Sequence, residues 1–317
     1  MFDINPLEIV AFARQASGAV AGAAGLHGWL FYNRSQGKFA KLLTPLIIGS
    51  SLVYIAAWSI GFLGYNQAHA HVGISLEPTL TDIAQSYAWQ IPLMGVLLVL
   101  LAATRWGLTR APRVIYFLYF IVLSLLISTY AISDSLDPQQ ISYIWHGWHS
   151  ILTLGTVIVL DYLFFTCRHD RALLAKFHWS FNRFTLLILT GLLLDVLSTY
   201  LILDEALRLN ARFFFVQTIV GILLINGIIL AEPLTRKATV FLASKRALPK
   251  PLNAVLGLAG AISFVSWNTI TFLDFVPDIS LSYGSLATIY LAVIACGFMG
   301  HLIMENVSLG VKPGKKR

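Results

Sequence analysis

Histidines inside strongly apolar segments are the first residues of this sequence that could carry chemistry. His146 and His149 lie three residues apart in the stretch "YIWHGWHSILTLGTVIVLDYLFF", which begins at Tyr143. A spacing of three places both rings on one face of a helix. Neutral imidazole binds copper and zinc, and it also ligates haem iron. The pair therefore predicts a cofactor site, or else histidines that bond to backbone carbonyl groups near a membrane surface.

Two further histidines lie at matching depths in two other apolar segments. His27 precedes Asn33 by six residues, and His301 precedes Asn306 by five. With a rise of 1.5 Å per residue, both lie roughly 8–9 Å inside the end of their segment. Matched histidines on two membrane helices are how a haem b can be held by two axial ligands. The alternative is that each ring bonds to a neighbouring helix.

A third pair, His69 and His71, falls in the segment 66–88, for which we expect a long external loop. Together with His146 and His149, these residues could bind copper or zinc on the outer side, because imidazole suits both metals. The alternative for His69 and His71 is a solvated surface loop.

Asp195 is the costliest residue of the chain to place in a membrane. It lies near the middle of "FTLLILTGLLLDVLSTYLIL", and Gly191, Ser198 and Thr199 share its face at helical spacing. An acid at this depth is a functional candidate by default. We expect it either to orient a histidine ring, as carboxylates do behind metal ligands, or to relay protons in a transporter. The remaining alternative is a protonated acid bonded to a carbonyl group.

The composition identifies the elements that must position these residues as membrane helices. The chain has 317 residues, of which 57% are hydrophobic and 12% charged, and its mean hydropathy is +0.74. Soluble domains carry about 25% charged residues. Segments of about 20 apolar residues suffice to cross a bilayer, and nine can be read along the chain. They are 16–33, 42–65, 89–108, 114–133, 143–166, 184–203, 213–233, 252–275 and 283–306.

These segments predict an all-α, polytopic helical bundle that forms a single integral-membrane domain over residues 1–317. Gly18 and Gly22 in the first segment leave space for another helix to approach closely. Lysines and arginines concentrate after every odd-numbered segment and in the basic tail 309–317. Because cytoplasmic loops attract basic residues, we expect the N-terminus outside and the C-terminus in the cytoplasm. The net charge of +7 thus reflects topology, and no nucleic-acid partner is expected.

The fifth to ninth segments resemble the CopD-like copper-resistance proteins and related haem-handling bundles of bacterial membranes. The resemblance rests on a helix that opens with His149 and continues to Gly155, and on the stretch "FFFVQTIVGILLINGIILAEPLTR". A Gly-Gly pair typically follows the helix histidine in those families, whereas Gly155 stands alone here. The resemblance implies metal or haem handling in the bacterial inner membrane, with His149 as the residue carried over.

Three functions follow from these residues. The first is histidine-dependent redox or metal handling, most concretely a b-type haem protein for electron transfer in the inner membrane. In that hypothesis His27 and His301 form one axial pair, while His146 or His149 serves an outer site. The second is a non-catalytic subunit or scaffold of a larger membrane complex, which needs no cofactor. The third is a proton-coupled transporter that uses Asp195. Whether the chain is an enzyme stays open, since it has no P-loop, GxSxG or HExxH motif.

Overall fold

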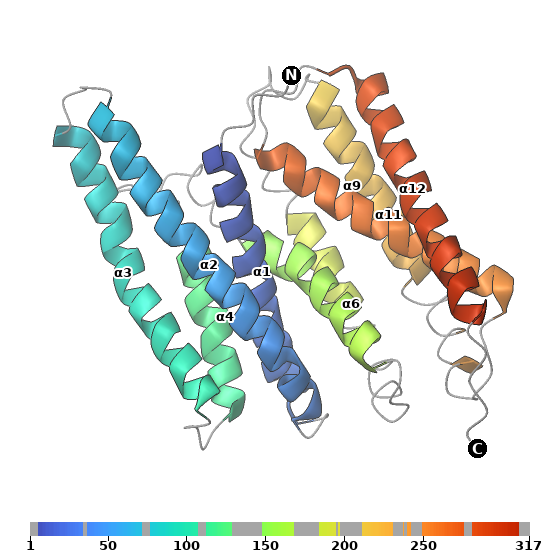
Figure 1. Cartoon of the computed structure of the whole chain (residues 1–317), viewed down its shortest axis with the longest axis horizontal. Coiled ribbons are helices and arrows are strands. Elements are labelled where there is room, and N and C mark those ends of the chain that lie inside the picture. The colour runs from blue at the N-terminus through green and yellow to red at the C-terminus, as the bar shows by residue number, and fades with distance from the viewer. Residues whose placement is uncertain are drawn as a thin grey trace. The chain divides into compact units, whose positions relative to one another are not determined.

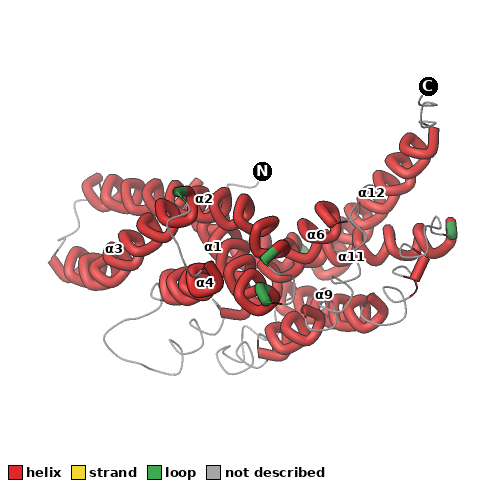
Figure 2. Tube along the Cα trace, turned by 90° about the horizontal axis from the view of Figure 1, so that it is seen from below, coloured by secondary structure: helices red, strands yellow, loops and turns green. Residues whose placement is uncertain are grey.

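The described part of the chain consists of helices and short turns and contains no strand, as Figure 2 shows. The computed structural model describes residues 6–33, 37–71, 77–106, 112–128, 148–167, 184–194, 196, 211–230, 237, 240–241, 249–275 and 281–310. Its principal elements are α1 (Pro6–Phe31), α2 (Lys38–His71), α3 (Glu77–Arg105), α4 (Pro112–Ser128), the π-helix η2 (Ile151–Gly155), α6 (Thr156–Cys167), α9 (Ala211–Ile229), α11 (Lys250–Phe275) and α12 (Tyr283–Gly310). The prediction of an all-α chain is confirmed for these residues.

Six of the described helices are long and apolar enough to cross a membrane. They lie in α1, α2, α3, α9, α11 and α12, and three shorter apolar helices span 112–127, 148–163 and 184–194. Each of the nine apolar segments expected from the sequence therefore contains a described helix. This pattern suggests a multi-pass membrane protein, while the count of nine crossings and the orientation of the termini stay predictions.

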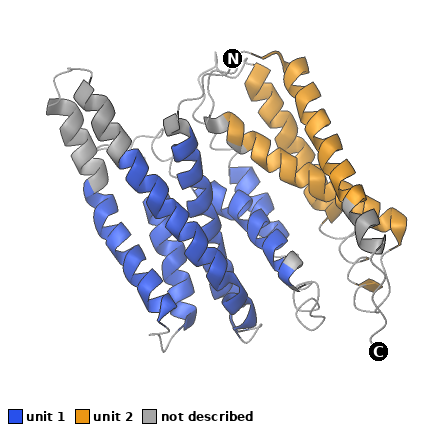
Figure 3. Cartoon of the chain, viewed as in Figure 1, with its two compact units in different colours: residues 1–203 blue, residues 204–317 orange. Residues whose placement is uncertain are grey.

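The chain divides into two compact units, coloured separately in Figure 3. Unit 1 comprises residues 1–203 and unit 2 comprises residues 204–317. The sequence led us to expect one domain over residues 1–317, whereas the contacts within the chain group its residues into these two units. Each unit is described by itself below.

Helix α1 is the central element of unit 1, because it packs against α2, α4, η2 and α6 (Figure 1). Its glycines allow this close packing. A Cβ on Gly25 would lie 2.8 Å from the backbone oxygen of Tyr116, and one on Gly22 would lie 3.2 Å from Ile151. A Cβ on Gly18 would lie 2.8 Å from the ring of Tyr54. The predicted close approach at Gly18 and Gly22 is therefore confirmed.

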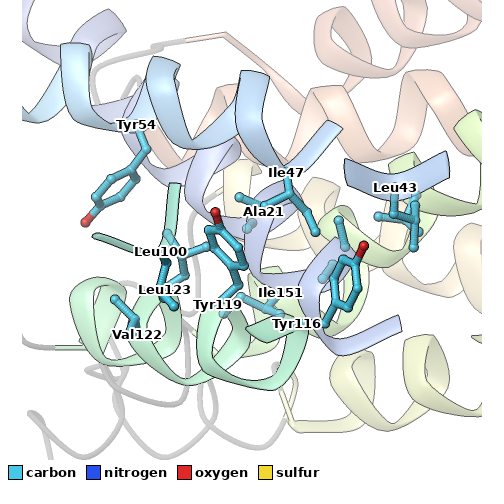
Figure 4. Packing of buried hydrophobic residues seen from close by; sticks show 14 of the residues in the cluster. Ala21, Leu43, Ile47, Tyr54, Leu100, Tyr116, Tyr119, Val122, Leu123 and Ile151 are labelled. Atoms are coloured by element: carbon cyan, nitrogen blue, oxygen red, sulfur yellow. The ribbon is translucent and has the colours of Figure 1, made fainter. Parts of the chain in front are cut away.

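The apolar core of unit 1 lies between α1, α2, α3 and α4 and also takes in residues of η2, α6 and the helix 184–194; Figure 4 labels ten of its residues. Two tyrosines of α4 bring hydroxyl groups into this core and satisfy them locally. The Tyr116 hydroxyl donates to the carbonyl oxygen of Ala40 at 2.9 Å, and the Tyr119 hydroxyl lies 3.0 Å from that of Thr104. A polar group buried in an apolar medium is costly without a partner. These bonds therefore link α4 to α2 and α3.

Unit 2 contains α9, α11 and α12, which pack against one another. The Asn226 side chain on α9 donates to the carbonyl oxygen of Ala259 on α11 at 2.9 Å. The hydroxyl groups of Ser266 on α11 and Tyr290 on α12 lie 2.7 Å apart. Interhelical bonds of this kind are the usual polar contacts between membrane helices.

The segment 66–88 is largely helical, so the expectation of a long loop there was wrong. Helix α2 continues to His71, and α3 already begins at Glu77. The sequence offers a reason, since no glycine or proline stands between Gly64 and Gly73, while Pro78 suits the first turn of a helix. With 34 residues, α2 is about 51 Å long, which exceeds the roughly 30 Å hydrocarbon core of a bilayer. His69 and His71 thus lie on the last turn of a helix.

Candidate functional site

His27 lies at the centre of unit 1, on the face of α1 that meets α6. Its side chain is 0% exposed, and its Nε2 atom lies 3.0 Å from the Thr156 hydroxyl. The Phe184 ring packs 4.2 Å from the imidazole, and the Phe31 ring lies 6.0 Å away on the same helix. The ring is therefore held by one polar contact and two aromatic contacts.

The second ring nitrogen of His27 has no hydrogen-bond partner among the described residues. This Nδ1 atom is buried and unpaired. A buried polar atom without a hydrogen-bond partner lowers the stability of the fold by about 1–3 kcal/mol. An unpaired nitrogen at this depth is a candidate for reversible proton or ligand binding.

Thr156 couples His27 to the backbone of the π-helix. Its hydroxyl donates to the Ile151 carbonyl oxygen at 3.2 Å and also contacts His27. A hydroxyl carries one hydrogen, so Thr156 cannot donate to both groups at once. When Nε2 carries the proton, Thr156 can accept from His27 and donate to Ile151. When Nε2 carries no proton, the Thr156 hydroxyl can donate either to Nε2 or to the Ile151 carbonyl oxygen, but not to both.

The π-helix η2 is the second unusual feature of this region. It occupies residues 151–155 and is followed directly by α6. Single π-turns inside α-helices are rare and are frequently found at functional sites. Gly155 permits the local packing, because a Cβ there would lie 2.8 Å from the Ala23 Cβ and would overlap the Ala19 carbonyl oxygen. The π-turn therefore rests directly on the backbone of α1.

Buried polar side chains follow the segment from His149 to Thr156 and meet two polar side chains of α1. The Gln15 side chain donates to the Ser150 hydroxyl at 3.1 Å, and the Thr153 hydroxyl donates to the His149 carbonyl oxygen at 2.7 Å. His149 is 5% exposed and Thr153 is 0% exposed. We call Gln15, His149, Ser150, Thr153, Thr156 and His27 the polar row.

The polar row follows two helices that run in the same direction. Gln15 meets Ser150 near the start of both segments, and His27 meets Thr156 further along both. This parallel direction is the one that an alternating chain predicts for its first and fifth crossings. Twelve residues of α1 separate Gln15 from His27, which corresponds to about 18 Å along the helix. On the facing segment only six residues separate Ser150 from Thr156, which is about 9 Å, so the row spans about 9–18 Å beside a bilayer core about 30 Å thick.

Several other predicted site residues lie where their side chains are not described. His146 and Asp195 fall outside the described residues, and the side chains of His69 and His71 are likewise not described. Gly191, one helical turn before Asp195, lies against the Thr153 side chain, where a Cβ would meet its methyl group at 2.6 Å. The helix 184–194 therefore packs directly on the polar row.

His301 belongs to unit 2 and packs against Gly257 of α11. A Cβ on Gly257 would overlap the imidazole ring, so the glycine makes the space that the ring fills. The His301 Nε2 atom is buried and has no hydrogen-bond partner among the described residues. Since His27 lies in unit 1, the pairing of these two histidines stays a prediction.

The described residues contain no group of three or more His, Cys, Asp or Glu side chains that could hold a metal ion. The predicted copper or zinc site involves His69, His71, His146 and His149, of which only the His149 side chain is described, and it stays a prediction. The roles of Gln15, Ser150 and Thr156 were not anticipated from the sequence. The spacing by three of Ser150, Thr153 and Thr156 within an apolar segment was the available signal.

Comparisons of the chain with protein-family models, with curated proteins and with solved structures gave no match. The resemblance to CopD-like proteins thus gains no support from them and stays a prediction. The geometry of the polar row is therefore the feature of this chain that points to a function.

Proposed function

We propose that this chain is a proton-translocating protein of the bacterial inner membrane, and that the polar row of unit 1 is part of its proton path. In this proposal the nine helices cross the bilayer with the N-terminus outside and the C-terminus in the cytoplasm. The observation that carries the proposal is His27, a fully buried titratable ring with Nε2 at the Thr156 hydroxyl and Nδ1 unpaired. Ionisable residues inside a membrane commonly mark proton relays.

The two nitrogens of His27 allow a proton to enter at one side of the ring and leave at the other. The unpaired Nδ1 can accept a proton while Nε2 releases one toward the Thr156 hydroxyl. Neutral imidazole has one donor and one acceptor nitrogen, and the charged ring has two donors. The Thr156 hydroxyl takes this proton as it gives up its own, and in this proposal the released proton passes on to Asp195, since the Ile151 carbonyl oxygen accepts a hydrogen bond but not a proton. Asp195 follows the helix that packs on Thr153, and in this proposal it exchanges protons with the row.

The contacts of His27 restrict how it could serve the haem hypothesis. An axial ligand presents a free imidazole nitrogen to the iron of a large planar group. Here Nε2 is engaged by Thr156, and the Phe184 ring lies 4.2 Å from the imidazole. Binding of haem iron through Nε2 would require both neighbours to move aside, which leaves the unpaired Nδ1 for an axial bond. An optical spectrum of the purified protein separates the two hypotheses, since a Soret band that disappears in His27→Ala would establish haem binding.

The test is proton flux into sealed vesicles that contain the purified full-length chain. A potassium gradient with valinomycin drives the protons, and a trapped pH-sensitive dye reports them. We expect flux above that of protein-free vesicles, and a decrease of at least tenfold in His27→Asn and Thr156→Val. Thr156→Ser keeps the hydroxyl and should retain most of the flux.

The matched control is Thr190→Val, which makes the same chemical change at an exposed position of the helix 184–194. Among the described residues, the Thr190 hydroxyl bonds to the Leu186 carbonyl oxygen of its own helix and to no other group. Its flux should equal that of the unmodified chain. Absence of flux from the unmodified chain, or equal flux in Thr156→Val and Thr190→Val, would refute the proposal.

A further inference from the structure

Four exposed basic residues gather at one end of unit 1, apart from the polar row. They are Lys38 and Lys41 on the first turn of α2, Arg105 at the end of α3, and Arg113 on the first turn of α4. All four side chains are exposed. They stand where chain segments from three different helices meet.

Contacts among neighbouring residues show that these helix ends are adjacent. Ala40, next to Lys41, accepts the hydrogen bond of the Tyr116 hydroxyl at 2.9 Å. Thr104, next to Arg105, lies 3.0 Å from the hydroxyl of Tyr119 on α4. The start of α2 and the end of α3 therefore both pack against the first two turns of α4.

Tryptophan side chains accompany the basic residues. The Arg113 guanidinium lies 5.7 Å from the centre of the Trp29 ring, in cation–π geometry. Trp29 also packs against Phe117 at 4.9 Å. Trp106 follows Arg105 and is 69% exposed. Tryptophan is enriched at the level of lipid headgroups, where an apolar ring with one N–H group is stable.

The described segments at this end of unit 1 hold one carboxylate, that of Asp161 on α6, against four basic side chains. Residues 26–33, 37–44, 104–106 and 112–120 contain four basic residues and no Asp or Glu. We call Lys38, Lys41, Arg105 and Arg113, with Trp29 and Trp106, the basic end. A surface with several fixed positive charges and an exposed indole fits an anionic group at the edge of an apolar phase.

We propose that the basic end binds anionic phospholipids, with the headgroup phosphate at the lysines and arginines and the acyl chains along the helices of unit 1. Trp106 supplies the apolar contact at headgroup level, and the Trp29 ring holds Arg113 in place. An exposed tryptophan would add no binding energy for a soluble phosphate ion, because such an ion has no apolar part. The phosphate that fits this surface is therefore that of a lipid headgroup in the bilayer. This inference is independent of the proton path.

The test measures lipid selectivity of the full-length chain in phosphatidylcholine vesicles. Spin-labelled phosphatidylglycerol and spin-labelled phosphatidylcholine are compared by the fraction of each that the protein immobilises. We expect a preference for phosphatidylglycerol that falls about fivefold for each basic residue removed at low ionic strength. Lys41→Gln with Arg113→Gln should therefore abolish most of it.

Two further variants make the result specific. Lys237→Gln with Lys250→Gln removes the same charge from exposed positions of unit 2 and should leave the preference intact. Arg113→Lys keeps the charge and should retain most of the preference, which separates lost binding from lost folding. Equal losses in the two double variants, no preference in the unmodified chain, or displacement of the lipid by millimolar glycerol phosphate would each overturn the inference.

Discussion

Replacing Gly155 by alanine tests the packing that supports the whole polar row. The added Cβ would lie 2.7 Å from the Ala19 carbonyl carbon and 2.8 Å from the Ala23 Cβ. Ordinary carbon–carbon contacts are about 3.5–4.0 Å, so α1 and the π-helix must separate by about 1 Å. Neither neighbouring atom can rotate away, because one belongs to the backbone and the other is attached directly to it.

The magnitude follows from two opposing terms. Overpacking a well-filled interface costs typically about 1–3 kcal/mol. Alanine gains up to about 1 kcal/mol over glycine inside a helix. We therefore expect Gly155→Ala to lower the free energy of unfolding by about 1–2 kcal/mol. The same separation should weaken the Thr156 contact with His27 and lower the proton flux.

The assay is unfolding of the full-length chain in mixed micelles with increasing dodecyl sulfate, followed by circular dichroism. Gly221→Ala is the matched control, because a Cβ there meets no atom within 4 Å. This control should unfold like the unmodified chain or slightly later. If Gly155→Ala were as stable as Gly221→Ala, the close approach of α1 to the π-helix would be refuted.

Two predictions concern unit 2 and use the same unfolding assay. Gly257→Val should lower the free energy of unfolding by about 1–3 kcal/mol, because its side chain must displace the His301 ring. The control Gly260→Val should not lower it, because a Cβ on Gly260 meets no atom within 4 Å. Equal losses in the two variants would contradict the contact between Gly257 and His301. Asn226→Leu removes the hydrogen bond to Ala259 and should cost about 0.6 kcal/mol, the average for such bonds in membranes. A loss above about 2 kcal/mol would mean that Asn226 does more than join two helices.

The boundary between α2 and α3 shows where reading the sequence alone fails. The polar residues after Tyr65 predict a loop, because polar composition is typical of connections between membrane helices. The structure continues α2 to His71 and starts α3 at Glu77. A helix can extend beyond the apolar layer into water, since its backbone bonds are satisfied within the helix itself. Polarity therefore marks the edge of the membrane better than the end of the helix.

The sequence by itself determined that the described chain is helical and apolar, and where its apolar segments lie. Runs of about 20 apolar residues satisfy their backbone groups in lipid only as helices or closed barrels, and these runs are uninterrupted. It also determined the glycine face of α1, because Gly18 and Gly22 allow close packing wherever the partner comes from.

Only the tertiary structure decided which side chains meet. The depth of His27 was readable from the sequence, but its neighbours Thr156 and Phe184 come from segments more than 100 residues away. Periodicity gives the buried face of a helix and does not say which helix lies against that face. The π-turn at Ile151–Gly155 was hidden for the same reason, since it depends on the contact of Gly155 with the backbone of α1.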